Sequence, residues 1–280
     1  MAKTSRGEKI RKLQQNQIKN GRGQGIGVNY KPFIQAHDNK VASEGWLTRH
    51  KGWKTKRIHH TLSNHERDYL YYLEWLDEVV DIREQFPLLP LSRTEEIADL
   101  LGIKHAHVDN VPVVMTTDFL ITIKTPNGLV DVVRTVKPGN KLDNRTLELF
   151  EIERRFFTEQ GINWEIITKR KLPKTLIKNV DWMCEARYLD TVPGIDGELV
   201  NLINQPLFMS ISNDGGKTPI SKVCLRSDKE FGLESGSCMF ILQYMLANKK
   251  WSTDMNVLIK ESRPLQIFNL EDQTRSKEIG

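Results

Sequence analysis

The residues best suited to chemistry in this 280-residue chain are an acid and a base on two neighbouring strand-like segments. Asp118 lies in the first segment, and Lys137 lies in the second, with Thr135 two residues before it. A carboxylate can ligate a divalent cation, and a compact ammonium group can stabilise charge on a phosphate. An Asp on one strand and an x-x-Lys segment on the next is typical of metal-dependent phosphodiester cleavage.

The hairpin that joins these segments decides which residues face each other. Residues 113–124 and 129–137 are rich in Val, Ile, Thr and Phe, and the Asn127-Gly128 pair between them is a strong signal for a tight turn. With that pair in the turn, residue i faces residue 255 − i, so Asp118 faces Lys137 and Thr135 shares their face. The same register predicts two further pairs, Lys124 with Asp131 and Phe119 with Val136. An ordinary hairpin with two stray charges is the alternative.

A third candidate side chain lies in a predicted amphipathic helix over residues 63–80. The apolar stripe of this helix recurs at helical spacing through Leu62, Tyr69, Leu73, Leu76 and Val80. Glu66 falls within the stripe, so its carboxylate points inward and needs a partner, which a metal ion would provide. The alternative is structural, because Ser63 and Glu66 also match a capping box, in which the glutamate accepts the amide of the N-cap residue.

A fourth acidic side chain, Glu153, lies in a predicted helix over residues 143–160 that Gly161 follows. Its neighbours at helical spacing are all apolar, namely Leu149, Phe150, Phe156 and Phe157. Glu153 therefore faces inward as well. Two interpretations stay open for it, a further metal ligand or a buried ion pair with an arginine.

These side chains together suit phosphodiester hydrolysis. The reaction needs an activated water, neutralisation of charge on the phosphate and help for the leaving oxygen, which one or two Mg²⁺ ions about 4 Å apart can provide. Mg²⁺ prefers oxygen ligands and keeps several waters, so two or three carboxylates suffice. We expect Glu66 and Asp118 to bind the metal, with Thr135 and Glu153 as further ligands. Lys137 is expected to hold or polarise the attacking water.

Composition describes a globular protein without a membrane segment. Charged residues make up 28% of the chain and hydrophobic residues 39%, and no apolar run approaches the roughly 18 residues of a membrane span. The three cysteines show no C-x-x-C spacing, which argues against a disulfide framework and against a zinc site. We therefore expect a cytoplasmic protein.

Charge is distributed unevenly along the chain. Residues 1–60 carry 14 Lys and Arg against 3 Asp and Glu, residues 61–172 carry 14 against 19, and residues 173–280 carry 13 against 14. A basic segment suits a polyanion such as DNA, whereas the acidic middle would repel DNA unless divalent cations intervene. We predict a basic N-terminal arm and DNA-contacting segment over 1–60, a catalytic domain over 61–172 and a partner-binding domain over 173–280.

The basic segment supplies the candidates for DNA contact, which are Arg22, Lys51, Lys54, Lys56 and Arg57. Residues 46–60, which begin at Trp46, are predicted to form an arm or loop along a DNA backbone. For residues 1–30 a flexible arm is the alternative. The sequence GRGQGIG at 21–27 is no dinucleotide fingerprint, because the third glycine is missing and no predicted strand precedes it.

The remaining patterns indicate the fold class. A strand over 81–90, a short helix over 93–101 and a central strand over 162–168 complete the order of a mixed-sheet α/β domain. Past Pro173 the pattern restarts, with helical pieces at 197–203 and 237–247 and a small hairpin formed by Trp251 and the alternating segment 257–268. Helices followed by a hairpin are typical of a winged-helix module, and a helical appendage of another shape is the alternative.

Several motifs then resemble those of the TnsA family, the endonuclease subunit of a heteromeric bacterial transposase. The motifs are RGQGIGVNYKP from Arg22, LEW from Leu73, DIREQFPLLP from Asp81, GIKH from Gly102, VMTTDFL from Val114, VKP from Val136, RTLE from Arg145 and ERR from Glu153. They cover most of residues 15–170, and DIREQFPLLP is long enough to be specific.

The resemblance implies a restriction-endonuclease-like fold with a winged-helix-like C-terminal domain. It also implies catalytic positions that match Glu66, Asp118 and Lys137, with Mg²⁺ as the cofactor and Mn²⁺ as a substitute. The implied activity is cleavage of double-stranded DNA at the five-prime ends of a transposon, in the nucleoid of a bacterial cell. The implied partners are a TnsB-type transposase, which cuts and joins the three-prime ends, and a TnsC-type AAA+ ATPase, which the C-terminal domain engages.

One position departs from the nucleases of this superfamily. They usually carry Glu, Asp or Gln two residues before the lysine, where this chain has Thr135. A hydroxyl can ligate a metal or hold a metal-bound water, although more weakly than a carboxylate, and Glu153 could compensate. A stand-alone restriction or repair nuclease and a non-catalytic assembly subunit with a decayed site are the two alternatives.

Overall fold

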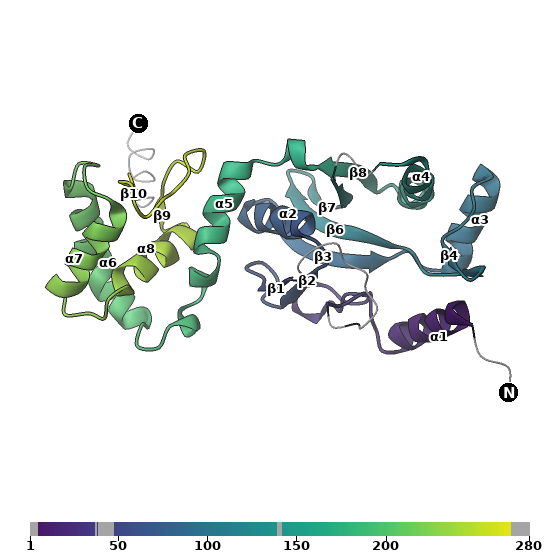
Figure 1. Cartoon of the computed structure of the whole chain (residues 1–280), viewed down its shortest axis with the longest axis horizontal. Coiled ribbons are helices and arrows are strands. Elements are labelled where there is room, and N and C mark those ends of the chain that lie inside the picture. Colours follow the sequence, from purple (N-terminus) through teal and green to yellow (C-terminus); the bar gives the residue numbers. More distant parts are fainter. Residues whose placement is uncertain (1–4, 37, 39–47, 139–141, 270–280) are drawn as a thin grey trace. The chain divides into compact units, whose positions relative to one another are not determined.

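The computed structural model of the chain describes residues 5–36, 38, 48–138 and 142–269, and the statements below concern these residues. The chain divides into two compact units, Met1–Leu172 and Pro173–Gly280, and each is described by itself. The first unit is built around a β-sheet and the second mainly from helices (Figure 1). Trp46, part of the segment predicted to follow DNA, lies outside the described residues.

The central sheet of the first unit has four strands, which are β3 (Val79–Pro87), β6 (Thr116–Thr125), β7 (Gly128–Lys137) and β8 (Asn163–Thr168). Their order is β3-β6-β7-β8, with antiparallel pairs at β3–β6 and β6–β7 and a parallel pair at β7–β8. The predicted mixed α/β architecture is confirmed. The predicted central position of β8 is wrong, because the crossover through α4 (Asn144–Thr158) returns the chain beside β7, and no described strand pairs with the other side of β8.

Helices cover both faces of this sheet because successive strand residues point to opposite sides. Leu120 and Val133 face α3 (Leu91–Leu101) and α4, where they join a buried cluster that also contains Leu88, Ile97, Ala98, Ile152, Phe156 and Phe157. Phe119, the neighbour of Leu120, meets Tyr69 of α2 (Asn64–Trp75), with ring centroids 5.5 Å apart. The alternation therefore places α2 on one face and α3 with α4 on the other.

The β6–β7 hairpin differs from the predicted register by two residues. Residue i pairs with residue 253 − i, from Thr125 with Gly128 to Phe119 with Arg134, so the turn is centred on Pro126-Asn127. Proline presets the φ angle for the first central position of a turn, and Gly128 takes the positive φ of 116° where the ladder resumes. Because strand side chains alternate with a period of two, a slip of two residues keeps every side chain on its face.

The corrected register replaces the two predicted partner pairs. Lys124 pairs with Leu129, so the Lys124–Asp131 pair and the Phe119–Val136 pair are wrong. Asp131 lies opposite Thr122 instead, whose hydroxyl donates to it at 2.5 Å, and Arg83 of β3 donates to the same carboxylate at 2.8 Å. The acid on β7 is thus neutralised across the sheet rather than along the hairpin.

The predicted helices exist with adjusted ends. The helix predicted over 63–80 stops at Trp75, and Val79 begins β3, because the β-branched pair at 79–80 joins the sheet. The Asp143 side chain accepts the Thr146 amide at 2.7 Å and so opens α4 as predicted.

The N-terminal segment is folded onto the first unit, so a flexible arm is wrong for its described residues. Helix α1 (Arg6–Lys19) is fastened by Gln14, whose side-chain amide bonds both the N–H and the C=O of Val114, at 2.8 and 3.2 Å. Further on, after the short helix η1 (Gly27–Asn29), the Tyr30 hydroxyl donates to the Glu84 carbonyl of β3 at 3.0 Å. A small ladder of β4 (His107–Val108) and β5 (Val111–Pro112) contacts α1.

A buried ion pair attaches the hairpin of β1 (Thr48–Lys51) and β2 (Ile58–Thr61) to β3. Arg57 donates to both carboxylate oxygens of Glu84, at 2.7 and 2.5 Å, and the His59 ring nitrogen Nδ1 lies 2.8 Å from the same carboxylate. Burial alone would raise the pKa of Glu84, but His59 and Arg57 outweigh it and hold that pKa well below its usual range. Arg57 is therefore an interior residue, in contrast to its predicted place on a DNA-contacting surface.

The second unit packs its helices around α8 (Ser237–Ala247), whose Cys238, Ile241 and Leu242 are fully buried. The other elements are α5 (Lys174–Met183), η3 (Glu185–Arg187), η4 (Leu189–Thr191), α6 (Gly197–Asn213), α7 (Ile220–Glu230), β9 (Trp251–Ser252) and β10 (Phe268–Asn269). β9 and β10 pair over two residues each, so a terminal hairpin exists, but the strand predicted over 257–268 is wrong for residues 257–267. No described helix is long and apolar enough to cross a membrane.

The Arg57–Glu84 pair gives the first prediction. Arg57→Ala should lower the free energy of unfolding by about 3–5 kcal/mol, because it leaves the buried Glu84 carboxylate without the arginine that donates to both of its oxygens. Urea unfolding followed by circular dichroism measures this loss. Arg155→Ala, at an exposed position of α4, is the matched control and should change stability by no more than about 0.5 kcal/mol. Equal losses in the two variants would contradict the structural role of Arg57.

Candidate active site

Asp118 lies near the start of β6, with its carboxylate directed at the neighbouring strand. Its Oδ2 accepts the backbone N–H of Val136 at 2.7 Å, and the side chain is buried. Burial raises the pKa of Asp118, while the charge of Lys137 and the Val136 N–H act in the opposite direction. If the hairpin register is extended by one residue, Asp118 falls opposite Thr135 rather than Lys137.

Glu66 lies in the first turn of α2 and does cap the helix. Its Oε2 accepts the Leu62 amide at 2.8 Å, its Oε1 accepts the Ser63 hydroxyl at 2.9 Å, and the Glu66 amide donates back to Ser63. The predicted N-cap by the Ser63 side chain is therefore confirmed, whereas the Glu66 carboxylate accepts the Leu62 amide and not the amide of the N-cap residue. Burial raises the pKa of Glu66 to about 7, and the negative charge of Asp118 adds to the rise. The two carboxylates thus lie close enough to repel each other.

Lys137, the last residue of β7, completes the cluster. Its positive charge lowers the pKa of both Glu66 and Asp118. The ammonium nitrogen lies 5.9 Å from the ring centroid of Phe150 on α4, in cation–π geometry. The structure thus brings together, within electrostatic reach, three side chains from α2, β6 and β7, which we call the acid–lysine cluster.

Thr135 and Glu153 form a second buried group beside this cluster. The Thr135 hydroxyl donates to Glu153 Oε1 at 2.5 Å, and the Trp164 indole donates to the same oxygen at 2.8 Å. Thr117 lies at the other side of Thr135, with the two hydroxyl oxygens 3.3 Å apart. Burial raises the pKa of Glu153 to about 7. No described arginine forms an ion pair with Glu153, contrary to the structural alternative, because a hydroxyl and an indole satisfy this carboxylate.

Gln85 is a contact of the acid–lysine cluster that the sequence does not indicate. Its side-chain amide donates to Glu66 Oε2 at 3.3 Å, and in the β3–β6 pairing it occupies the position opposite Asp118. Gln85 has a φ of 51°, an uncommon value for a residue with a side chain. The irregular backbone redirects the amide, and no local pattern in the sequence announces such a distortion.

The donor set of the cluster fits a hard divalent cation. A carboxylate offers about four acceptor sites, and Glu66 uses three of them for Leu62, Ser63 and Gln85. A cation between Glu66 and Asp118 would remove their mutual repulsion. Within the described part of the chain no three His, Cys, Asp or Glu side chains are arranged to hold an ion. Backbone carbonyls, hydroxyls or waters would have to complete the shell, as Mg²⁺ commonly accepts.

The five cations expected to contact DNA are in different environments. Arg22 forms an ion pair with Asp38 at 2.6 Å, and Lys54 donates to the Leu76 carbonyl at 2.5 Å. Arg57 is buried, as described above, whereas Lys51 and Lys56 are exposed. Three of the five candidates therefore have partners within the fold, and two are exposed.

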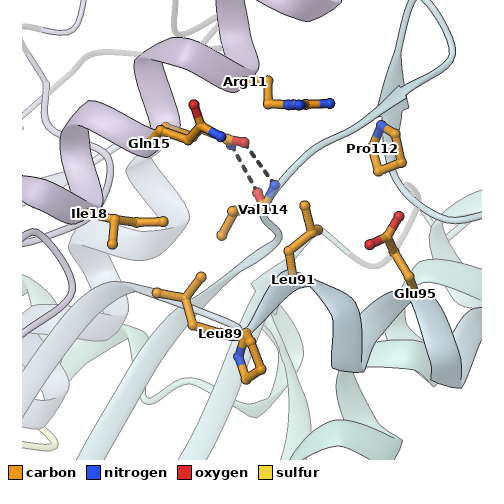
Figure 2. A pocket seen from close by; sticks show the side chains of 10 residues that line it. Arg11, Gln15, Ile18, Leu89, Leu91, Glu95, Pro112 and Val114 are labelled. Carbon is orange, nitrogen blue, oxygen red and sulfur yellow. Dashed lines mark hydrogen bonds between the residues drawn. The ribbon is translucent and has the colours of Figure 1, made fainter.

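A separate hollow of about 740 Å³ lies between α1 and α3 (Figure 2). Apolar side chains such as Ile18, Leu89 and Leu91 line most of it, and Arg11 and Glu95 contribute charge. None of the three residues of the acid–lysine cluster lines this hollow. The candidate site is therefore separate from this hollow.

Comparison with known proteins identifies the family. Residues 76–169 match a family model described as TnsA-like endonuclease N terminal, and residues 172–255 match one described as TnsA endonuclease C terminal. The chain is 38% identical over 232 residues to the Escherichia coli protein named Transposon Tn7 transposition protein TnsA, covering 82% of this chain and 81% of that one. The chain belongs to the TnsA endonuclease family.

Membership of the TnsA family confirms the resemblance seen in the motifs and makes the chain a transposition endonuclease by relationship. The N-terminal TnsA match contains Asp118, Lys137 and Glu153, whereas Glu66 precedes it. The association of Glu66 with this TnsA site therefore rests on the geometry of α2. The C-terminal TnsA match begins at residue 172, next to the boundary between the two compact units.

The high pKa of Glu153 gives a pH-dependent prediction. Folding raises the pKa of the Glu153 carboxyl group from about 4.5 to about 7. The free energy of unfolding therefore falls as pH increases between these two values, because the unfolded chain releases the proton more readily than the folded one. Glu153→Gln keeps an oxygen for the Thr135 and Trp164 donors but cannot ionise. Relative to the wild type, this variant should gain about 3 kcal/mol between pH 4.5 and 7. Urea unfolding in metal-free buffer across this range measures the difference, and parallel pH profiles would contradict it.

Proposed function

We propose that the chain is the Mg²⁺-dependent endonuclease subunit of a heteromeric transposase and cuts double-stranded DNA at the five-prime ends of a transposon. The observation that carries this proposal is the convergence of Glu66, Asp118 and Lys137 in a member of the TnsA family. Two buried acids and one ammonium suit metal-assisted phosphodiester hydrolysis.

The roles of the residues follow from their surroundings. Glu66 and Asp118 would hold the ion, which when bound activates a water and neutralises charge on the phosphate. The Val136 N–H fixes the Asp118 carboxylate at 2.7 Å, and Gln85 orients Glu66. Lys137 would hold the attacking water and stabilise the negative charge that grows on the phosphate. Mn²⁺ should replace Mg²⁺, since both accept oxygen ligands.

Glu153 supports Thr135, which stands where related nucleases carry a longer polar side chain. The Thr135 hydroxyl proton is directed to Glu153, so the oxygen lone pairs stay available to a metal ion or to a metal-bound water. We propose that Glu153 acts through this hydroxyl and in this way compensates for the missing carboxylate. A direct bond from Glu153 to the ion is the second arrangement, and it would require the Thr135 contact to break.

The finer architecture and the partners belong to the same proposal. We propose a restriction-endonuclease-like core for the first unit and a winged-helix-like module for the second, in which helices precede the β9–β10 pair. The second unit would engage a TnsC-type AAA+ ATPase, and a TnsB-type transposase would cut the three-prime ends. The site of action would be the bacterial nucleoid.

Strand cleavage tests the catalytic proposal. Asp118→Asn and Lys137→Met should each lower the rate of five-prime cleavage by roughly 10²- to 10³-fold or more. Each substitution removes a charge at the reacting phosphate while the new side chain is similar in size to the original. The assay uses labelled transposon-end DNA with the partner transposase and Mg²⁺. Asp99→Asn, an exposed carboxylate of α3, is the control and should cleave normally. Cleavage by Asp118→Asn at the wild-type rate would remove the assignment, and activity without the partner would indicate a stand-alone nuclease.

Metal binding is a separate expectation. Calorimetric titration of the full chain with MgCl₂ should give saturable binding in the millimolar range, and Asp118→Asn should weaken it at least about tenfold, since one of two carboxylate ligands is lost. Absence of saturable binding by the wild type would instead favour a decayed site in an assembly subunit.

A further inference from the structure

Three consecutive cations follow β8 and are all exposed. β8 ends at Thr168, and the short helix η2 (Lys169–Lys171) comes directly after it. Leu172 is buried and anchors the end of this turn, so the three side chains before it project into solvent. None of these three cations belongs to the acid–lysine cluster, so the run needs an explanation of its own.

The sheet register places this run beside the acid–lysine cluster. Thr168 is the partner of Lys137 in the parallel β7–β8 pair, which Figure 1 shows as neighbouring strands. The C-terminal ends of parallel neighbours lie side by side at one end of the sheet, and neighbouring strands lie about 4.8 Å apart. Asp118, near the start of the antiparallel β6, belongs to the same edge. Lys169 therefore directly follows Thr168, the β8 residue that pairs with Lys137.

The three cations differ in what they contact. Lys171 forms an ion pair with Glu165 of β8, which gives it a structural partner. Lys169 and Arg170 have no ion pair and no side-chain hydrogen bond within the described residues. Two adjacent, unneutralised cations repel each other, and a polyanion at this edge would remove that cost.

We propose that Lys169 and Arg170 bind the phosphate backbone of the duplex DNA beside the scissile position. This inference rests on the proposed nuclease function and adds the surface that holds the substrate. Exposed cations on a short turn suit phosphate contacts, which position DNA without reading its sequence. They also offset the repulsion between DNA and the two buried acids. An acidic surface on a partner protein is the competing occupant.

The test is the salt dependence of DNA binding by the full chain. Fluorescence anisotropy with a labelled 30-base-pair duplex of arbitrary sequence is measured in metal-free buffer, so that no cleavage interferes. For the double variant Lys169→Glu/Arg170→Glu, the slope of log affinity against log salt should become shallower by about two, one for each lost phosphate contact. Lys124→Glu is the matched control, because Lys124 is exposed on the same sheet near the hairpin turn at the opposite edge.

Each outcome decides the inference. A shallower slope in the double variant, with an unchanged slope in Lys124→Glu and unchanged thermal unfolding in both, supports it. An unchanged slope in the double variant, an equal loss in the control, or no binding by the wild type at low salt overturns it. If the double variant keeps the DNA binding of the wild type but no longer binds a partner protein, the surface belongs to a protein contact instead. The nuclease proposal is tested separately by cleavage in the presence of Mg²⁺, so its failure appears in that experiment and not in this metal-free binding assay.

Discussion

The arrangement at the sheet edge depends on an unfavourable interaction, the repulsion between two buried carboxylates. Burial and the nearby negative charge of Asp118 raise the pKa of Glu66 to about 7, and burial raises the pKa of Asp118 as well. Backbone amides of Leu62 and Val136 and the charge of Lys137 act against these rises. The surrounding donors therefore only partly offset the cost of ionising these two acids, and the proposed cation would offset more of it.

The rest of the first unit keeps these groups in place. The β6–β7 hairpin brings Asp118 to the Val136 amide, and the return through α4 lays β8 beside β7. The buried Arg57–Glu84 pair joins the β1–β2 hairpin to β3, the strand that also carries Gln85. Some of the cations predicted to contact DNA, such as Arg57, thus stabilise the fold, and further exposed positive charge lies at the end of β8.

How much could be predicted from the sequence depended on the kind of signal. Hydrophobic alternation and helical spacing predicted the mixed sheet, the inward direction of Glu66 and Glu153, and the shared face of Thr135 and Lys137, because these follow from periodicity alone. The hairpin register failed because Asn127-Gly128 was a stronger local signal than the proline before it, yet the error of two residues preserved the faces.

Other features depend on tertiary contacts that have no local signature. The sequence shows that Arg57 is basic but not that Glu84 lies opposite it in the interior. The distorted backbone at Gln85 and the indole that satisfies Glu153 are likewise set by the packing of distant segments. Whether β8 lies at the edge or in the centre of the sheet depends on whether another strand pairs with its free side. The residue pattern of β8 alone does not show this.

The cap at the start of α2 has a consequence for how this protein can evolve. The carboxylate of Glu66 closes the first turn of its helix and also faces Asp118, so one side chain serves folding and the proposed chemistry together. A mutation there is penalised twice, and a lineage that abandoned cleavage would still be selected to retain the glutamate. Persistence of this residue among relatives is therefore poor evidence of activity, whereas drift at Asp118 or Lys137 would reveal that activity had been lost.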